Sequence, residues 1–298
     1  MKRILITGGS GLVGREITRL LEQEGKEVAW LSRSPKNTRQ KSFFWDIEKQ
    51  EMDKEALTWC EGIIHLAGEG VAEKRWTAAR KRQILQSRIL STLLLYDNLE
   101  RLAAKPQAFV SASAVGYYGF DTGEALQRED SLPGVDFLAS VVKKWEAETE
   151  KIATLGIRTA VLRIGIVLAK EGGALAEMLK PPVAAPLGDG KQYLSWIHIG
   201  DLARMFSYAL ANTSMEGVYN AVGPHPASNS ELTRAAAKAA GKPFVPIGVP
   251  GFALKLVLGE MAQMVLGGNK VSSAKIEATG FSYTFGELTD ALKAIYGK

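Results

Sequence analysis

The sequence predicts an α/β fold, in which a doubly wound parallel sheet with helices on both faces is joined to a smaller mixed α/β C-terminal lobe. Two observations support this fold class. Short apolar runs alternate with stretches of helical periodicity through residues 1–165. After residue 165, prolines and glycines divide the chain into short pieces. The alternation is typical of βαβ units, in which a helix crosses back over the sheet after each strand.

The first half contains the regular elements of the predicted sheet. Each expected strand is a short, buried, largely apolar run, and each expected helix carries its apolar side chains on one stripe. The expected strands are residues 2–7, 27–31, 42–45, 62–67, 107–113 and 157–164, and the expected helices are 11–23, 76–102 and 136–155.

The second half is expected to be less regular. Short helices are predicted at 200–211, 230–240 and 251–265, with irregular chain between 181 and 190. We therefore expect a first domain at 1–165, with returning segments around 195–225. Residues 166–298 should form the smaller lobe, including a C-terminal domain around 245–298.

Composition and charge favour some partners and argue against others. The net charge is +5, but basic and acidic residues are interleaved, which argues against nucleic acid. No apolar run approaches the roughly 20 residues of a membrane helix, so no membrane partner is expected. The single cysteine, Cys60, excludes an internal disulfide, and no signal-peptide pattern opens the chain, which favours the cytoplasm. Cys60 and three scattered histidines offer no metal-ligand spacing.

A glycine pattern lies between the first strand and the first helix. Gly8, Gly11 and Gly14 have the spacing GxxGxxG. Glycine permits the sharp turn after the strand and lets the backbone approach a diphosphate at the helix N-terminus, where the N–H groups of Leu12 and Val13 are free. In this strand–turn–helix context the motif predicts a nicotinamide dinucleotide on a Rossmann-type sheet. The alternative is a purely structural glycine turn.

The end of the second strand indicates which dinucleotide is bound. A site that prefers NAD usually places Asp or Glu here to hold the ribose 2′-hydroxyl. This chain has Ser32 and Arg33 instead. A hydroxyl and a guanidinium both donate hydrogen bonds to a 2′-phosphate, so the expected cofactor is NADP(H). The alternative for Arg33 is a surface arginine beside Lys36 and Arg39.

Ten segments, in order along nearly the whole chain, resemble the extended short-chain dehydrogenase/reductase superfamily. The match is closest to its atypical YfcH-like "epimerase family protein" branch, in the NAD-dependent epimerase/dehydratase superfamily. The segments are TGGSGLVG (7–14), LSR (31–33), HLAGE (65–69), KRW (74–76), SR (87–88), SASAVGYYG (111–119), DFLASVVKKWE (136–146), LRIGIVL (162–168), SWIHIGDLA (195–203) and GFSYTFGELTDALK (280–293).

The resemblance implies further cofactor-binding residues. Asp46, with Ile47, resembles the pair that meets the adenine, and the backbone of Leu66 and Ala67 resembles the segment that passes the ribose and diphosphate. The remaining positions lie near the bound NADP in this branch: Gln83, Arg88 and Arg163. The alternatives are ordinary surface arginines and, for Gln83, a solvated helix position.

The resemblance also implies a catalytic site, from which two groups are missing. Ordinary members use Ser, Tyr and Lys, and Ser113 fits the serine position. Phe137 stands where the Tyr is expected and Val141 where the Lys is expected, and neither can transfer a proton. Tyr117 could supply a phenol in compensation, although aromatic packing against the sheet is the alternative.

The substrate side is expected at Gly172, Gly173, the loop 181–191 and the C-terminal lobe, with a small-molecule substrate as partner. The alternative for the loop is a plain connection. Three functions remain open: an NADP(H)-binding oxidoreductase or epimerase acting on an unidentified carbonyl or hydroxyl compound, a non-catalytic NADP(H)-sensing regulator, and a nucleotide-sugar epimerase. Leu194 stands where nucleotide-sugar members carry an Arg for the substrate diphosphate, which argues against the third. For His198, a hydrogen-bonded core position is favoured over a catalytic base.

Overall fold

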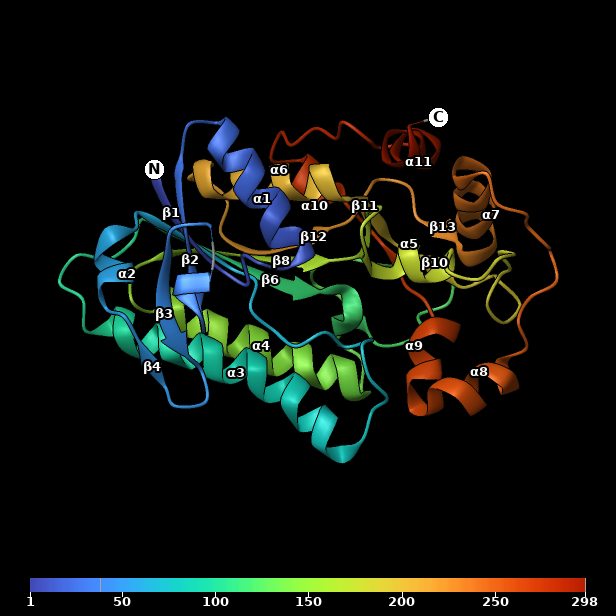
Figure 1. Cartoon of the computed structure of the whole chain (residues 1–298), viewed down its shortest axis with the longest axis horizontal. Helices are drawn as coiled ribbons and strands as arrows, with labels where there is room; N and C mark the ends of the chain where they lie inside the picture. The colour runs from blue at the N-terminus through green and yellow to red at the C-terminus, as the bar shows by residue number, and fades with distance from the viewer. Residues whose placement is uncertain (38, 298) are drawn as a thin grey trace.

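The main body of the protein is a twisted, mostly parallel sheet (Figure 1). The structure is a computed structural model that describes residues 1–37 and 39–297. Within those residues the sheet has eight strands in the order β12-β8-β6-β5-β1-β2-β3-β4, and only β3 and β4 are antiparallel neighbours. The strands are β1 Arg3–Thr7, β2 Glu27–Ser32, β3 Ser42–Asp46, β4 Glu51–Met52, β5 Gly62–His65, β6 Ala108–Ala114, β8 Arg158–Ile164 and β12 Gly217–Ala221.

Helices cover both faces of this sheet. Helices α1 (Leu12–Gln23) and α6 (Ile199–Ala211) pack together on one face, and α3 (Ala78–Glu100) and α4 (Phe137–Ala153) pack together on the other (Figure 1). The short helix α2 (Glu55–Trp59) lies between β4 and β5 in the chain. The doubly wound Rossmann-type sheet predicted from the sequence is therefore confirmed.

The central strands are buried on both sides, which explains why they are nearly continuous apolar runs. Ile4, Leu5 and Ile6 of β1 have no exposed surface. Ile4 and Ile6 face the core beneath α1 and α6, whereas Leu5 faces the core beneath α3. Since alternate side chains of a strand point to opposite faces, both faces must be apolar for the strand to be buried.

The smaller lobe is assembled from short elements of the second half and one segment of the first half. Its strands are β7 Leu126–Gln127, β9 Ile166–Leu168, β10 Tyr193–Leu194, β11 Trp196–His198, β13 Ala227–Ser228 and β14 Lys270–Val271, and its helices are α5 Gly173–Met178, α7 Asn229–Ala240, α8 Gly251–Leu258, α9 Ala262–Leu266 and α11 Leu288–Tyr296. The short helix α10 (Ala274–Glu277) packs against β12 of the main sheet instead. The 3₁₀ turns are η1 Pro35–Asn37, η2 Val115–Tyr118 and η3 Gly259–Met261. Among the described residues, no helix combines the length and apolar character needed to cross a membrane.

Two sequence predictions about these elements need correction. The continuous helix expected at 251–265 is wrong, because Gly259 has a φ of +62° and separates α8 from η3 and α9. The strand expected at 62–67 ends at His65, where the next two N–H groups bond to the Thr7 side chain. The boundary between the two parts of the chain remains a prediction.

Candidate functional site

At two positions of the glycine loop between β1 and α1, a side chain would clash with neighbouring backbone. Gly8 has a φ of +69°, and a Cβ there would lie 3.0 Å from the Leu66 carbonyl carbon. A Cβ on Gly14 would lie 2.4 Å from the Gly8 carbonyl oxygen. Either substitution would press a side-chain carbon against backbone, so the tight turn depends on glycine. The loop has the form expected for a diphosphate cradle.

The first turn of α1 presents uncapped N–H groups beside the predicted substrate loop. Gly11 is the N-cap residue and has no side chain to accept their hydrogen bonds, so the N–H groups of Leu12 and Val13 are free to bind an anion. A Cβ on Gly172 or Gly173 would lie 3.9 or 3.7 Å from Leu12 Cδ2. The fold therefore brings the Gly172–Gly173 segment, far away in sequence, to the start of α1.

The backbone of Leu66 and Ala67 is fixed against the glycine loop. Both N–H groups donate to Thr7 Oγ1, at 3.0 and 3.1 Å. Thr7 is the last residue of β1, and the next residue is Gly8, whose missing side chain lets this backbone approach. The Thr7 hydroxyl thus joins two segments predicted to hold the dinucleotide, together with the bond from the Leu66 N–H to the Thr7 carbonyl oxygen at 3.2 Å.

His65 completes this arrangement as a neutral side chain. The Thr7 hydroxyl accepts from two N–H groups and donates its own hydrogen to His65 Nδ1 at 2.8 Å. On the other side, Thr92 donates to the Arg88 carbonyl oxygen and so accepts from His65 Nε2, at 3.1 Å. Burial, with a smaller effect of Arg88, lowers the pKa of His65 to about 3. The neighbours therefore require the neutral tautomer protonated at Nε2.

At the end of β2, a cationic hollow of about 480 Å³ lies where the 2′-phosphate is expected. It is lined by Arg33, Ser34, Pro35, Lys36 and Phe44. Ser32 accepts a hydrogen bond from the Ser34 N–H at 3.1 Å, which shapes the turn after the strand. The lining residues include two cations and no acid, so the hollow suits an anionic group next to a flat, partly apolar ring.

Two predicted cofactor residues make other contacts. Asp46 Oδ1 accepts from the N–H groups of Glu48 and Lys49, at 3.0 and 3.1 Å, and so holds the turn between β3 and β4. Gln83 is exposed on α3, and its Oε1 lies 3.4 Å from Arg80 Nη1. The structure does not bring either side chain to the glycine loop through any contact among the described residues.

Arg88 is a largely buried guanidinium behind the Leu66–Ala67 segment. Its Nη1 donates to the carbonyl oxygens of Ile84 (2.8 Å) and Glu69 (3.1 Å), and its Cζ lies 5.1 Å from the Trp145 ring centroid. A Cβ on Gly68 would lie 3.1 Å from Cζ. Burial lowers the pKa of Arg88 to about 10. Among the described residues no carboxylate pairs with Arg88, and Nε and Nη2 form no hydrogen bond.

The predicted residues Ser113, Tyr117 and Arg163 meet around a carboxylate. Ser113 Oγ donates to Glu146 Oε1 at 2.5 Å, and Arg163 binds both oxygens of Glu146 at 2.8 Å. Arg163 Nη1 also donates to the Tyr118 hydroxyl at 3.1 Å, and its Cζ lies 3.4 Å from the Tyr117 ring centroid. Burial opposes the charge of Arg163, but the hydrogen bonds and charge of Glu146 raise its pKa overall. Arg163 is therefore satisfied inside the protein.

Sequence reasoning did not single out Glu146. The available signal is its place on α4, because it lies four residues after the buried Val142 and three before the buried Thr149. A carboxylate on the stripe that faces the sheet must find a partner there. The partners come from β6 and β8, and only the register Ser113↔Arg163 places them side by side.

The positions expected to carry the catalytic Tyr and Lys belong to an apolar cluster. Phe137 packs edge-on against Trp76, with ring centroids 5.1 Å apart. Val141 is buried in the same cluster together with Met261 of the smaller lobe. The Lys81 ammonium lies 5.0 Å from the Phe137 ring centroid. No proton-transferring group occupies positions 137 and 141, and the space around them is filled by side chains.

The segment 194–201 has structural roles. His198 Nδ1 accepts from the Gly200 N–H at 3.0 Å and so caps α6, and burial lowers its pKa. This contact matches the core position favoured from the sequence. Leu194 is a buried strand residue paired with Ala227. An apolar side chain there cannot grip a diphosphate.

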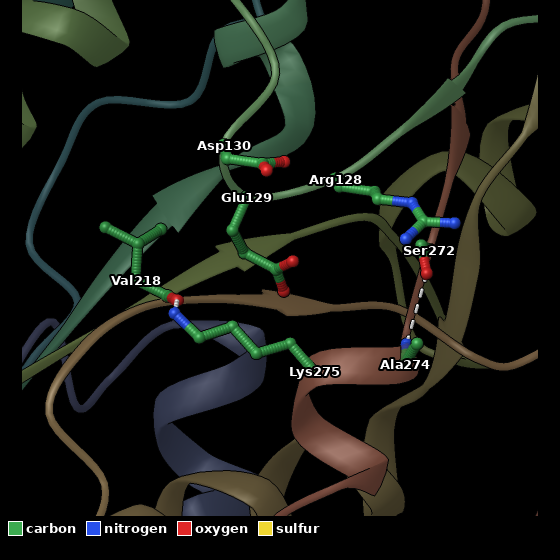
Figure 2. A pocket seen from close by; sticks show the side chains of 7 residues that line it. All are labelled: Arg128, Glu129, Asp130, Val218, Ser272, Ala274 and Lys275. Atoms are coloured by element: carbon green, nitrogen blue, oxygen red, sulfur yellow. Dashed lines mark hydrogen bonds between the residues drawn. The ribbon is translucent and has the colours of Figure 1, made fainter.

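Another hollow, of about 650 Å³, lies beside Val218 of the edge strand β12 (Figure 2). Lys275 Nζ donates to the Val218 carbonyl oxygen at 2.6 Å, and Glu129 accepts from the Asn220 N–H at 2.8 Å. None of the predicted site residues lines this hollow, whose other charged residues are Arg128 and Asp130. In the described part of the chain, no group of three His, Cys, Asp or Glu side chains could hold a metal ion.

Comparison with known proteins identifies relatives over the whole chain. Residues 4–140 match the NAD dependent epimerase/dehydratase family, and residues 249–295 match a domain of unknown function, DUF1731. The chain is 36% identical to the mouse epimerase family protein SDR39U1, with 98% of this chain and 99% of the mouse protein covered. It is 33% identical to the epimerase family protein YfhF of Bacillus subtilis (strain 168), with 98% and 97% covered.

A solved structure shows the same architecture. The crystal structure of human epimerase family protein SDR39U1 (isoform 2) with NADPH is 34% identical, covers 99% of both chains and has a TM-score of 0.89. Likeness at this identity and coverage extends to the smaller lobe as well as the sheet. The resemblance inferred from the ten segments is confirmed, and the chain belongs to the SDR39U1-like epimerase family proteins, an atypical branch of the short-chain dehydrogenases/reductases within the NAD-dependent epimerase/dehydratase family.

Proposed function

We propose that this protein binds NADP(H) and acts as an oxidoreductase or epimerase on a small carbonyl or hydroxyl compound. The observation that carries the choice of cofactor is the cationic hollow after β2, where Arg33 and Lys36 stand without an acid. The human relative whose structure contains NADPH supports the same choice. A reducing compartment suits the buried, unpaired Cys60, and we propose the cytoplasm.

Different residues of this chain would bind different parts of the cofactor. The glycine loop and the first N–H groups of α1 would hold the diphosphate, and Arg33 would hold the 2′-phosphate. Arg88 has two unused donor positions and would bind a further oxyanion or hydroxyl of the ligand. The bound nicotinamide would supply the hydride chemistry, and Ser113 or Tyr117 would contact the substrate oxygen.

Fluorescence titration with NADPH and NADH tests the cofactor assignment. We expect NADPH to bind at least tenfold more tightly, because Arg33 offers charge-assisted hydrogen bonds to the 2′-phosphate. Arg33→Gln should weaken NADPH binding roughly tenfold to a hundredfold and leave NADH binding nearly unchanged. Arg101→Gln is the matched control, since Arg101 is an exposed arginine at the C-terminal end of α3 and is not among the predicted cofactor residues. Equal or tighter binding of NADH to the natural chain would contradict the proposal.

A second candidate function is a non-catalytic NADP(H)-sensing regulator. The observation that favours it is the apolar packing at Phe137 and Val141, which leaves no ordinary Tyr–Lys pair. NADPH oxidation across a panel of small aldehydes and ketones separates the two functions. Turnover of any compound, lost in Ser113→Ala or Tyr117→Phe, supports the enzyme. Tight NADPH binding with no turnover, together with a co-purifying partner, supports the regulator.

A further inference from the structure

Helix α8 is apolar on nearly every side and yet buries none of its residues. Six of its eight residues are apolar in the sequence GFALKLVL. Phe252, Leu256 and Val257 are 77%, 81% and 67% exposed. A helix with this composition is normally buried in a core or in contact with lipid. Figure 1 shows α8 at the rim of the smaller lobe, away from the main sheet.

The exposed apolar surface continues beyond the helix. Ile247, just before α8, is 77% exposed, and Val245 and Val183 are 39% and 41% exposed. The backbone N–H of Val245 donates to Ala184, and a second bridge joins Leu187 to Val249, so the two segments run together toward α8. We call this surface the apolar ridge; it consists of Val183, Val245, Ile247, Phe252, Leu256 and Val257.

Along the chain segment that carries most of the apolar ridge, the charged residues have one sign. Between Glu231 and Glu260 the sequence contains no acidic residue. The same stretch contains four cations, Arg234, Lys238, Lys242 and Lys255. Lys255 is exposed and lies three residues after Phe252 and one before Leu256, so it borders the apolar stripe of α8. An apolar stripe with a lysine at its border suits the interface of an anionic bilayer, where the lysine stem extends toward the headgroups.

The dimensions of the apolar ridge argue against a stable contact with a second copy. A standard protein interface uses about 20–30 residues on each side, whereas the ridge has six. An eight-residue helix is about 12 Å long, which is sufficient to lie in the headgroup region but not to span a bilayer. The sequence expectation of no membrane partner rested on the absence of a long apolar run and does not address a helix of this length.

We infer that the apolar ridge binds the surface of anionic lipid bilayers, with α8 lying flat in the headgroup region. Phe252, Leu256 and Val257 would insert their side chains, while Lys255 would contact anionic headgroups. This inference does not depend on the identity of the cofactor or the substrate.

Vesicle flotation with the full chain tests this binding. The probes are vesicles of phosphatidylcholine containing about 30 mol% phosphatidylglycerol, and vesicles of phosphatidylcholine alone. We expect the protein to float with the anionic vesicles and to float much less with the neutral ones. Phe252→Ser with Leu256→Ser should reduce flotation roughly tenfold or more, because both apolar side chains that insert are removed.

The matched control is Leu132→Ser with Val135→Ser, two exposed apolar residues outside the apolar ridge. This control should float like the natural chain. Both double variants should unfold at the same temperature as the natural chain, because all four replaced side chains are exposed. Absence of flotation with anionic vesicles, or equal flotation of the Phe252/Leu256 variant, would overturn the inference. If the natural chain did not float but formed a concentration-dependent dimer, and only the Phe252/Leu256 variant abolished that dimer, the ridge would bind a second copy. That outcome would also overturn the inference.

Discussion

Two arginines on α3, the buried Arg80 and the half-buried Arg88, differ in how their charges are balanced. Arg80 pairs with Glu69 at 2.8 Å and with Glu73 at 3.5 Å, and it also donates to the Gly70 carbonyl oxygen. Arg88 has only carbonyl partners among the described residues. Because a half-buried cation without a carboxylate partner adds little to stability, we predict that Arg88 serves to bind a ligand.

Replacing each arginine with methionine separates these roles. Arg88→Met keeps the stem that packs on Trp145, so we expect unchanged or higher stability without cofactor and roughly tenfold weaker NADPH binding. Arg80→Met should lower the free energy of unfolding by about 2 kcal/mol, because Glu69 loses its buried partner. Urea unfolding and NADPH titration measure the two effects. If Arg88→Met destabilised the protein and left NADPH binding unchanged, Arg88 would be structural.

The sequence predicts which residues could belong to the candidate site, but not which of them contact each other. The sequence indicated that Arg163 and Ser113 matter, but not that Glu146 would bind both. The contacts of Glu146 with Ser113 and Arg163 depend on strand register and on the position of α4. The contacting residues are 33 and 17 positions apart in the chain, so no local sequence pattern marks these contacts. Asp46 and Gln83 were predicted from family position alone, and their contacts show other partners.

At the scale of elements, His65 joins β1, β5 and α3 through Thr7 and Thr92. The pKa of His65 is about 3 in the folded protein and near 6.5 in the unfolded chain. Between these two pH values the unfolded chain binds a proton at His65 that the folded protein does not bind. The contribution of His65 to stability is therefore complete above about pH 6.5 and decreases as the pH falls toward 3.

Unfolding at two pH values tests this linkage. Between pH 6.5 and 5.0 the natural chain should lose about 1.5 kcal/mol more stability than His65→Gln, since ordinary carboxylates titrate little in that window. His225→Gln is the control, because it removes an exposed imidazole that lies outside the contacts of Thr7 and Thr92. Urea midpoints at both pH values give the comparison. Equal slopes for the natural chain and His65→Gln would mean that His65 can be protonated in the folded protein.

The elements that the sequence predicted well are those with strong local periodicity. Helix α1 and strand β1 follow from one apolar stripe and one apolar run. The break at Gly259 was missed because six apolar residues precede it and the helical pattern resumes after it. Helix α11 was missed too, since its two buried residues, Ala291 and Leu292, are identified as core only by packing against α7.

At the scale of the whole molecule, the main sheet and the C-terminal segment are joined at Asp201 of α6. This carboxylate has no exposed surface. It accepts from the N–H groups of Thr284 and Phe285, at 2.9 and 2.8 Å, and from Arg204 at 2.8 Å. The motifs SWIHIGDLA and GFSYTFGELTDALK, which are nearly 80 residues apart in the chain, are therefore two sides of one contact.

Asp201→Asn tests whether this contact determines global stability. An amide can accept only one of the two backbone bonds and leaves the other N–H facing its own donor, so we expect a loss of about 2–4 kcal/mol. Asp290→Asn is the control: that carboxylate is 63% exposed and its ion pair with Lys293 is 3.7 Å long, so a change below about 0.5 kcal/mol is expected. A single urea transition shifted to lower midpoint in Asp201→Asn would mean that the C-terminal segment unfolds together with the sheet. A separate early transition would mean that the C-terminal segment detaches alone. An unchanged curve would show that the contact stabilises neither the C-terminal segment nor the sheet.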